Sequence, residues 1–199
     1  MTAGDNTPAT WIFGYGSLVS PASIGWTIDR EPVFGDNMFP AHLTGYGRRW
    51  NYGSIQLRGD WTHEGARIEQ GVVISLGVIA ADEVCNGVVF AVTAEELAAL
   101  DWRERDYERV DVTAAVEHEA PDERVHEVVL YVPSPGSVAR YEAARDEGRA
   151  AIRQTYWDLV HEGFAAMGAE HGEMMRATPL PDVPVADITL HLPPGSRRT

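Results

Sequence analysis

Two short segments of the sequence carry residues that could bind and transform a small polar molecule. The first is the glycine-rich turn Gly14-Tyr15-Gly16-Ser17-Leu18, which follows the bulky run 11–13. A loop of small residues between a strand and a helix start exposes several backbone N–H groups together, and such a loop binds small anions such as carboxylates. The turn lacks the third glycine of a dinucleotide-binding loop, because position 19 is Val. Taken alone, the glycines are also consistent with a tight turn that binds nothing.

The second segment holds a carboxylate, Glu104, between Arg103 and Arg105. Upstream, Thr93 followed by Glu96 matches a helix capping box, so Glu104 is expected where a short helix ends. The negative end of the helix dipole disfavours a charged carboxylate and raises its pKa, whereas neighbouring arginines lower it. A raised pKa is what a general base needs near neutral pH. The sequence does not decide whether the helix dipole or the arginines have the larger effect on the pKa. A surface carboxylate in a charged turn is the alternative interpretation.

Other catalytic and metal-binding patterns are missing from the sequence. The seven histidines show neither HxH nor HExxH spacing, and the single cysteine cannot build a zinc knuckle. Ser17 does not lie in a G-x-S-x-G elbow, so a hydrolase triad has no support. Cys85 stands beside Asn86-Gly87 without a basic cluster and is interpreted as a small buried residue rather than a nucleophile. We therefore predict that the protein uses no metal and no cofactor.

The composition indicates a soluble protein. The chain has 199 residues, a formal net charge of -14 and a pI of about 4.8, which argues against nucleic acid as a partner. One cysteine excludes an internal disulfide and fits a reducing compartment. The first ten residues do not match a signal peptide, and the most apolar stretch, Gly71 to Ala80, is too short to span a bilayer. We expect a cytoplasmic protein that binds no membrane, and its oligomeric state is not indicated.

Bulky and β-branched runs predict most of the strands. Strands are expected at 11–13, 41–44, 49–54, 71–79, 86–92, 107–116 and 126–132. Between them, residues 61–70 are expected to form a polar loop, and 80–85 and 134–136 are expected to form turns.

Helix signals are fewer and concentrate in the C-terminal third. Ser20 followed by Pro21 predicts a helix start. Between 150 and 167, apolar residues recur at helical spacing and predict an amphipathic helix: Ile152, Tyr156, Leu159, Val160 and Phe164. Strands followed by helices indicate an α+β fold. We expect a disordered N-terminus at 1–10, one domain at 11–178 and an extended proline-rich arm at 179–199, where prolines prevent regular helix.

Together these segments resemble the γ-glutamylcyclotransferases, most closely the ChaC-type branch that degrades glutathione. Phe13 to Leu18 resembles the FGYGSL motif of that family. Arg48 to Ser54 is similar to its RRFxxGS segment, Leu57-Arg58-Gly59 to the RG that follows, and Cys85 to Phe90 to its CxGVxY/F strand. Leu100 to Glu104 resembles the LDxRE segment that bears the catalytic glutamate. The resemblance covers residues 11–132.

The resemblance implies a fold and a set of site residues. The fold is the cyclotransferase fold, a mixed sheet curled into a small barrel with helices outside and the pocket at its mouth. Glu104 is implied as the general acid and base, and no cofactor is needed. The resemblance also implies these substrate-binding residues: Tyr15, Gly16, Ser17, Leu18, Ser54 and Tyr107.

The implied reaction closes a γ-glutamyl group into 5-oxoproline. The α-amine attacks the γ-carbonyl of the same short chain, and such intramolecular attack has a high effective molarity. Glu104 would take a proton from the α-ammonium and deliver one to the departing amine. Glutathione is the first donor to expect. The alternatives are a γ-glutamyl-amine, a γ-glutamyl amino acid or a carrier-linked γ-glutamyl group, and, in a different class, a non-catalytic module that binds small carboxylates.

Overall fold

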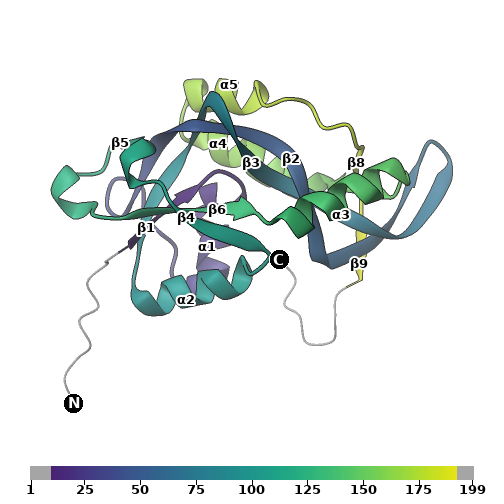
Figure 1. The fold of residues 1–199 in the computed structure, drawn as a ribbon, viewed down its shortest axis with the longest axis horizontal. Coiled ribbons are helices and arrows are strands. Elements are labelled where there is room, and N and C mark those ends of the chain that lie inside the picture. The colour runs from purple at the N-terminus through teal and green to yellow at the C-terminus, as the bar shows by residue number, and fades with distance from the viewer. Residues whose placement is uncertain (1–9, 192–199) are drawn as a thin grey trace, which may run out of the picture.

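The computed structural model describes residues 10–191, and their fold is built on one large mixed sheet (Figure 1). Its strands are β1 (Thr10–Gly14), β2 (Met38–His63), β3 (Ala66–Val92), β4 (Tyr107–Asp111), β5 (Val116–His118), β6 (Val128–Pro133), β7 (Ala150–Arg153), β8 (Val185–Ala186) and β9 (Thr189–His191). The α-helices are α1 (Pro21–Ile28), α2 (Ala94–Arg103), α3 (Pro135–Asp146), α4 (Gln154–Ala166) and α5 (Ala169–Arg176). Short 3-10 turns lie at η1 (Ser17–Val19), η2 (Thr113–Ala115) and η3 (Asp122–Arg124).

The sheet runs in the order β4-β6-β1-β3-β2-β5, with β7, β8 and β9 attached beside this path. β1 pairs antiparallel with β3 and parallel with β6, so the sheet is mixed as predicted. No pairing among the described residues joins β4 to β5, and the path stays open. The α+β class with flanking helices is confirmed, whereas the expected closure into a barrel is not found.

A long antiparallel hairpin of β2 and β3 forms the largest part of the sheet and extends to one side of the molecule (Figure 1). Its tip is a two-residue turn at Glu64 and Gly65, where φ is 50° and 79°. Gly65 meets this backbone requirement without steric cost. The polar loop predicted at 61–70 is therefore wrong, because the strands continue to the hairpin tip.

The turn predicted at 80–85 is also wrong, because β3 continues through it. Thr44 pairs with Val84 and Tyr46 pairs with Ala80, with a register shift between the two pairs. Most side chains of this stretch are exposed, which produces the polar sequence pattern of a turn. The partner strand satisfies the backbone groups, and that long-range pairing outweighs the local signal.

The predicted helix starts are confirmed. The Ser20 hydroxyl accepts from the Ser23 N–H at 3.3 Å with Pro21 in the first helical position, and the capping box of Thr93 and Glu96 makes both of its bonds. The turn predicted at 134–136 instead begins α3, which Ser134 caps. The expected helix at 150–167 begins later than predicted, because its first residues form β7 and α4 starts only at Gln154.

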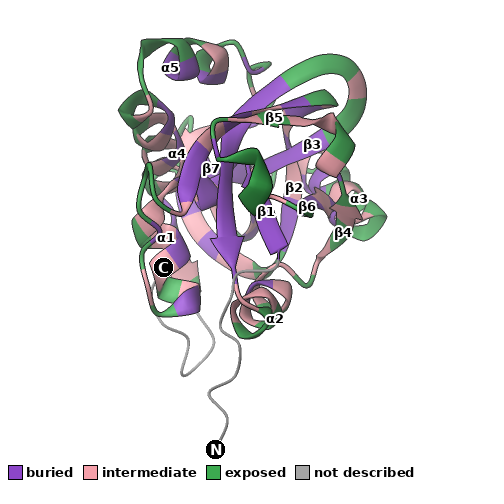
Figure 2. Cartoon of the chain, turned by 90° about the vertical axis from the view of Figure 1, so that its left-hand side faces the viewer, coloured by how far each residue is buried: buried purple, intermediate pink, exposed green. Residues whose placement is uncertain are grey.

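Helices cover the sheet on two sides around a continuous core. In Figure 2, α1, α4 and α5 lie along one side and α3 lies on the other. The core contains large fully buried side chains from strands and helices, including Trp11, Phe13, Phe90, Leu100 and Phe164. The helix α4 thereby brings its inner face against η1, next to the glycine-rich turn.

The described part of the proline-rich arm contains two short strands, β8 and β9. β8 pairs with β7 and β9 pairs with β2. Ile188 of the arm packs with Trp61 and Val73 in a second, smaller cluster, so the arm packs against the part of the hairpin that is nearer its tip. Thr10 belongs to β1, which shortens the expected disordered N-terminus by one residue. The predictions for 1–9 and 192–199 lie outside the described residues.

Candidate active site

The glycine-rich turn and Glu104 line the same small cavity of about 30 Å³. Its walls come from β1, the turn, η1, β3, β4, β6, α4 and the C-terminal end of α2. The lining residues are Phe13, Tyr15, Gly16, Ser17, Leu18, Leu76, Glu104, Tyr107, Tyr131 and Tyr156. Segments separated by more than a hundred residues in the sequence therefore converge on one carboxylate.

Glu104 lies directly after α2, where its N–H donates to the Leu100 carbonyl at 2.8 Å. The capping box fixes where α2 begins, and buried Leu100 holds its last turn against the core. The Glu104 side chain is 13% exposed and pairs with the Arg103 Nε at 2.9 Å. Burial raises the pKa of Glu104, and the pairing with Arg103 lowers it by less. Burial therefore decides the direction of the pKa shift of Glu104, which the sequence left open.

The two flanking arginines differ in position. Arg103 faces Glu104, whereas Arg105 is exposed and stacks its guanidinium over the Trp102 ring at 4.8 Å. Arg105 Nη1 also donates to the Trp102 carbonyl at 2.7 Å. Only one of the two neighbouring cations therefore acts directly on the carboxylate.

The glycine-rich turn needs small residues at defined positions. A Cβ at Gly14 would lie 2.5 Å from the Leu18 carbonyl oxygen, and a Cβ at Gly16 would lie 3.0 Å from the Tyr156 hydroxyl. The turn is closed by the Val19 N–H, which donates to the Gly16 carbonyl at 3.0 Å. The two glycines therefore let the backbone approach both η1 and the cavity closely.

A buried guanidinium supports the turn from behind. Arg48 is 5% exposed, and its Nε donates to the Tyr15 carbonyl at 3.1 Å. Its Nη2 donates to Asn86, and its guanidinium lies 4.3 Å from the Phe164 ring centroid. Arg48 thus joins the turn to β3 and α4.

Tyrosine rings enclose the remaining walls. Tyr107 stacks on Tyr52 with 4.2 Å between ring centroids, and the Tyr15 hydroxyl donates to the Tyr131 carbonyl at 2.7 Å. Burial raises the pKa of Tyr15 and Tyr107 well above the ordinary value and raises the pKa of Tyr156 to about 12. These side chains are neutral phenols at physiological pH, so they surround Glu104 without adding charge.

Comparison with known proteins places this arrangement in a family. Residues 10–153 match the model of a family described as ChaC-like protein. The chain belongs to this ChaC-like family. The match includes both the glycine-rich turn and Glu104, and it ends just before α4.

Individual relatives of this ChaC-like chain are distant. It is 29% identical over 133 residues to gamma-glutamylcyclotransferase 2-3 of Arabidopsis thaliana, and the match covers 64% of this chain and 59% of that protein. Among solved structures, a human protein titled as uncharacterized has a TM-score of 0.50 and 17% identity, covering 92% of this chain and 93% of its own. A structure titled as a yeast gamma-glutamyl cyclotransferase specific to glutathione has a TM-score of 0.48 and 16% identity, covering 87% and 89%. The human structure is similar in fold alone.

Most of the predicted site residues lie together in the ChaC-like chain. Tyr15, Gly16, Ser17, Leu18, Tyr107 and Glu104 all line the cavity. Ser54 is not part of the lining. Its hydroxyl accepts from the N–H groups of Gln56 and Leu57 at 3.2 and 2.9 Å, where the pairing of β2 with β3 shifts register. A role of Ser54 in substrate binding stays a prediction.

Four residues of the lining were not predicted from the sequence: Phe13, Leu76, Tyr131 and Tyr156. Tyr156 was interpreted as part of the apolar stripe of a helix. Its phenol oxygen accepts from the Leu76 N–H at 3.2 Å, a contact that joins α4 to β3. The spacing of apolar residues along α4 does not distinguish this tyrosine from its core neighbours, so no sequence signal could have found it.

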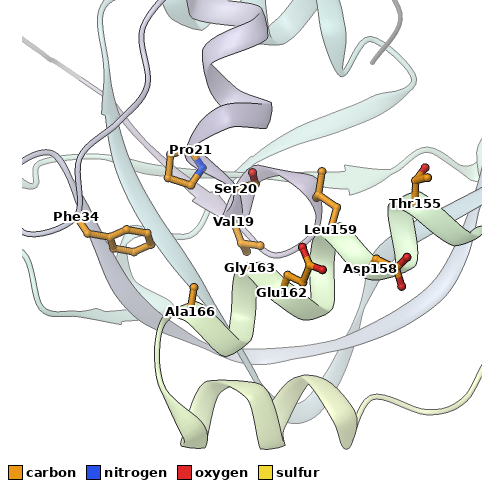
Figure 3. A pocket seen from close by; sticks show the side chains of 10 residues that line it. All are labelled: Val19, Ser20, Pro21, Phe34, Thr155, Asp158, Leu159, Glu162, Gly163 and Ala166. Atoms are coloured by element: carbon orange, nitrogen blue, oxygen red, sulfur yellow. The ribbon is translucent and has the colours of Figure 1, made fainter.

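A second, larger pocket of about 480 Å³ lies between α4 and the segment from η1 into α1 (Figure 3). Asp158 and Glu162 of α4 stand opposite Val19, Ser20 and Pro21, as the figure shows. The pocket is open to solvent and contains neither Glu104 nor the glycine-rich turn.

Within residues 10–191, no group of three or more His, Cys, Asp or Glu side chains is arranged to hold a metal ion. In the same part of the chain, none of the helices is long and apolar enough to cross a membrane.

Proposed function

We propose that this ChaC-like protein is a γ-glutamylcyclotransferase that releases 5-oxoproline from a γ-glutamyl donor, with Glu104 as general acid and base. The observation that carries the proposal is the shared guanidinium of Arg103, which binds Glu104 Oε1 at 2.9 Å and Ser17 Oγ at 2.8 Å. A largely buried carboxylate is thereby held beside the glycine-rich turn. A module that only binds small anions gains nothing from a carboxylate in that place, because two negative charges repel each other.

The reaction needs the substrate's α-amine in its neutral form. At neutral pH this amine is protonated, so a base must remove its proton before it attacks the γ-carbonyl. A carboxylate whose pKa is raised by burial holds that proton well enough to return it to the departing amine. Cyclisation of one short chain needs no other nucleophile, so folding the substrate and moving one proton account for the chemistry.

The turn and Tyr156 supply hydrogen-bond donors for the negative charges of the substrate. We assign the backbone N–H groups of Tyr15, Gly16, Ser17 and Leu18 to the α-carboxylate. The Tyr156 oxygen accepts from the Leu76 N–H, which leaves the phenol proton to donate to the γ-carbonyl oxygen as it becomes negative. Burial raises the pKa of Tyr156 to about 12, so it donates as a neutral phenol.

The cavity must enlarge to admit this substrate. Its volume of about 30 Å³ corresponds to roughly one water molecule, which is less than a γ-glutamyl group needs. Tyr107, which stacks on Tyr52, and Tyr156 of α4 both belong to the lining. We expect these rings to move when the donor binds.

Glutathione is the first donor to test. The experiment incubates the purified protein with glutathione, γ-glutamyl dipeptides, γ-glutamyl amines and a carrier-linked γ-glutamyl group, and measures 5-oxoproline. Release of 5-oxoproline from glutathione supports the whole proposal. Release from another donor, with glutathione left intact, supports the reaction and replaces glutathione as the donor. Tight binding of glutamate or 5-oxoproline without turnover of any donor would contradict the enzymatic function and favour a binding module.

A further inference from the structure

Arg103, the last residue of α2, contacts three parts of the site with one side chain. Its Nε pairs with Glu104 Oε1 at 2.9 Å. Its Nη2 donates to Ser17 Oγ at 2.8 Å and to Ser23 Oγ at 3.1 Å, and its Nη1 donates to the Ser23 carbonyl at 2.8 Å and to Thr27 Oγ1 at 3.0 Å. The guanidinium therefore links the base, the glycine-rich turn and α1.

These contacts use all the donors of the guanidinium. Arginine has one N–H on Nε and two on each terminal nitrogen, in a rigid planar fork. One donor meets Glu104, two meet acceptors through Nη2 and two through Nη1. The side chain is 24% exposed, yet no N–H remains for a substrate carboxylate. Arg103 is thus arranged to hold other groups in place rather than to bind the substrate.

We propose that Arg103 is the positioning residue of this site, which holds Glu104 with Oε2 free toward the substrate and makes the Ser17 hydroxyl a donor. Because Oε1 is bound to Arg103, the other carboxylate oxygen is the one that takes the proton of the α-ammonium. Because Ser17 Oγ accepts from Arg103, its own proton points elsewhere and donates to the substrate α-carboxylate. This inference rests on the proposed function.

Arg103 is also the charged neighbour that acts on Glu104 within the described residues. The other groups that face the carboxylate are phenols from five different elements: Tyr15, Tyr52, Tyr107, Tyr131 and Tyr156. Burial keeps all of them neutral. Removing the guanidinium therefore leaves burial unopposed and raises the pKa of Glu104 further.

Three variants test this positioning role. Arg103→Met removes the positive charge and all five N–H donors. Arg103→Lys keeps the charge but has three donors instead of five. Arg105→Met, the control, removes a neighbouring cation that does not face Glu104. Two measurements are made on each variant. The first is kcat/KM for 5-oxoproline release between about pH 5 and about pH 9. The second is an NMR titration of the Glu104 carboxyl, assigned by comparison with Glu104→Gln.

We expect Arg103→Met to lose about tenfold to a hundredfold in kcat/KM at neutral pH and to shift the acid limb of its profile upward. Arg103→Lys should keep the acid limb near that of the wild type but lose activity, because three donors on a single nitrogen cannot reproduce the five contacts that hold Glu104, Ser17 and α1 in place. Arg105→Met should change neither kcat/KM at neutral pH nor the position of the acid limb. If Arg103→Met fails to fold, the Arg103→Lys profile still decides, because a merely structural role predicts normal activity in the folded fraction.

The outcomes separate the two proposals. No 5-oxoproline from the wild type with any donor overturns the proposed function, whatever the titration shows. In an active wild type, an unmoved Glu104 titration in Arg103→Met overturns the positioning role alone. Equal shifts in Arg103→Met and Arg105→Met would also overturn it, because they would show a general effect of charge rather than a specific contact.

Discussion

Replacing Glu104 by Gln removes the proposed proton acceptor and leaves the shape of the site. Gln has nearly the same volume, and its amide oxygen can still accept from Arg103 Nε. Arg103 also keeps its contacts with Ser17, Ser23 and Thr27. We therefore expect the glycine-rich turn and α1 to stay in place, so that a loss of activity reports on proton transfer.

The expected loss follows from the role of a general base. Such a group contributes about a hundred- to ten-thousand-fold in rate, and a hundredfold loss corresponds to about 2.7 kcal/mol of transition-state stabilisation. Binding of the γ-glutamyl donor should persist or tighten, because Gln does not repel the substrate α-carboxylate. The assay combines steady-state 5-oxoproline release with a binding isotherm of the donor on the inactive variant.

The same substitution has a predicted effect on stability. Burial raises the folded-state pKa of Glu104 above the unfolded value of about 4.3, so the ionised carboxylate opposes folding at neutral pH. Glu104→Gln should therefore be at least as stable as the wild type at pH 7. The difference should vanish as the pH falls below the unfolded pKa, and urea unfolding at both pH values measures it.

Two other glutamates are matched controls. Glu108 is exposed on β4 beside the cavity-lining Tyr107, and Glu96 belongs to the capping box and pairs with Arg30 at 2.5 Å. Neither Gln variant should lose more than a small factor in turnover. Near wild-type turnover by Glu104→Gln, or an inactive Glu108→Gln, would refute the assignment of the base.

Three further predictions concern the same reaction. The acid limb of kcat/KM should lie above about pH 4.3, because burial raises the pKa of Glu104, and a limb at or below that value would contradict the burial argument. Tyr156→Phe should lower kcat by about a hundredfold with little change in KM, and unchanged turnover would exclude Tyr156 as the oxyanion donor. Dialysis against EDTA should leave 5-oxoproline release intact, and a loss that zinc restores would show that the reaction needs a metal.

Local signals in the sequence were sufficient wherever a few neighbouring residues decide the structure. Ser20 with Pro21, and Thr93 with Glu96, start helices through hydrogen bonds within one turn of chain. The resemblance of short segments to a known family predicted that family, and the family model matches residues 10–153. The roles that the resemblance implied for Glu104 and the turn stay predictions. The class of fold followed from the order of strands and helices.

Tertiary structure decided what depends on distant partners. The stretch 80–85 is strand rather than turn because β2 pairs with its backbone, and Tyr156 joins the site because α4 packs beside the glycine-rich turn. The direction of the Glu104 pKa is also a tertiary property, since it depends on how far the fold removes the carboxylate from water. The sequence places an arginine on each side of Glu104, and only the packing of α2 against α1 turns Arg103 toward the carboxylate and leaves Arg105 on the surface.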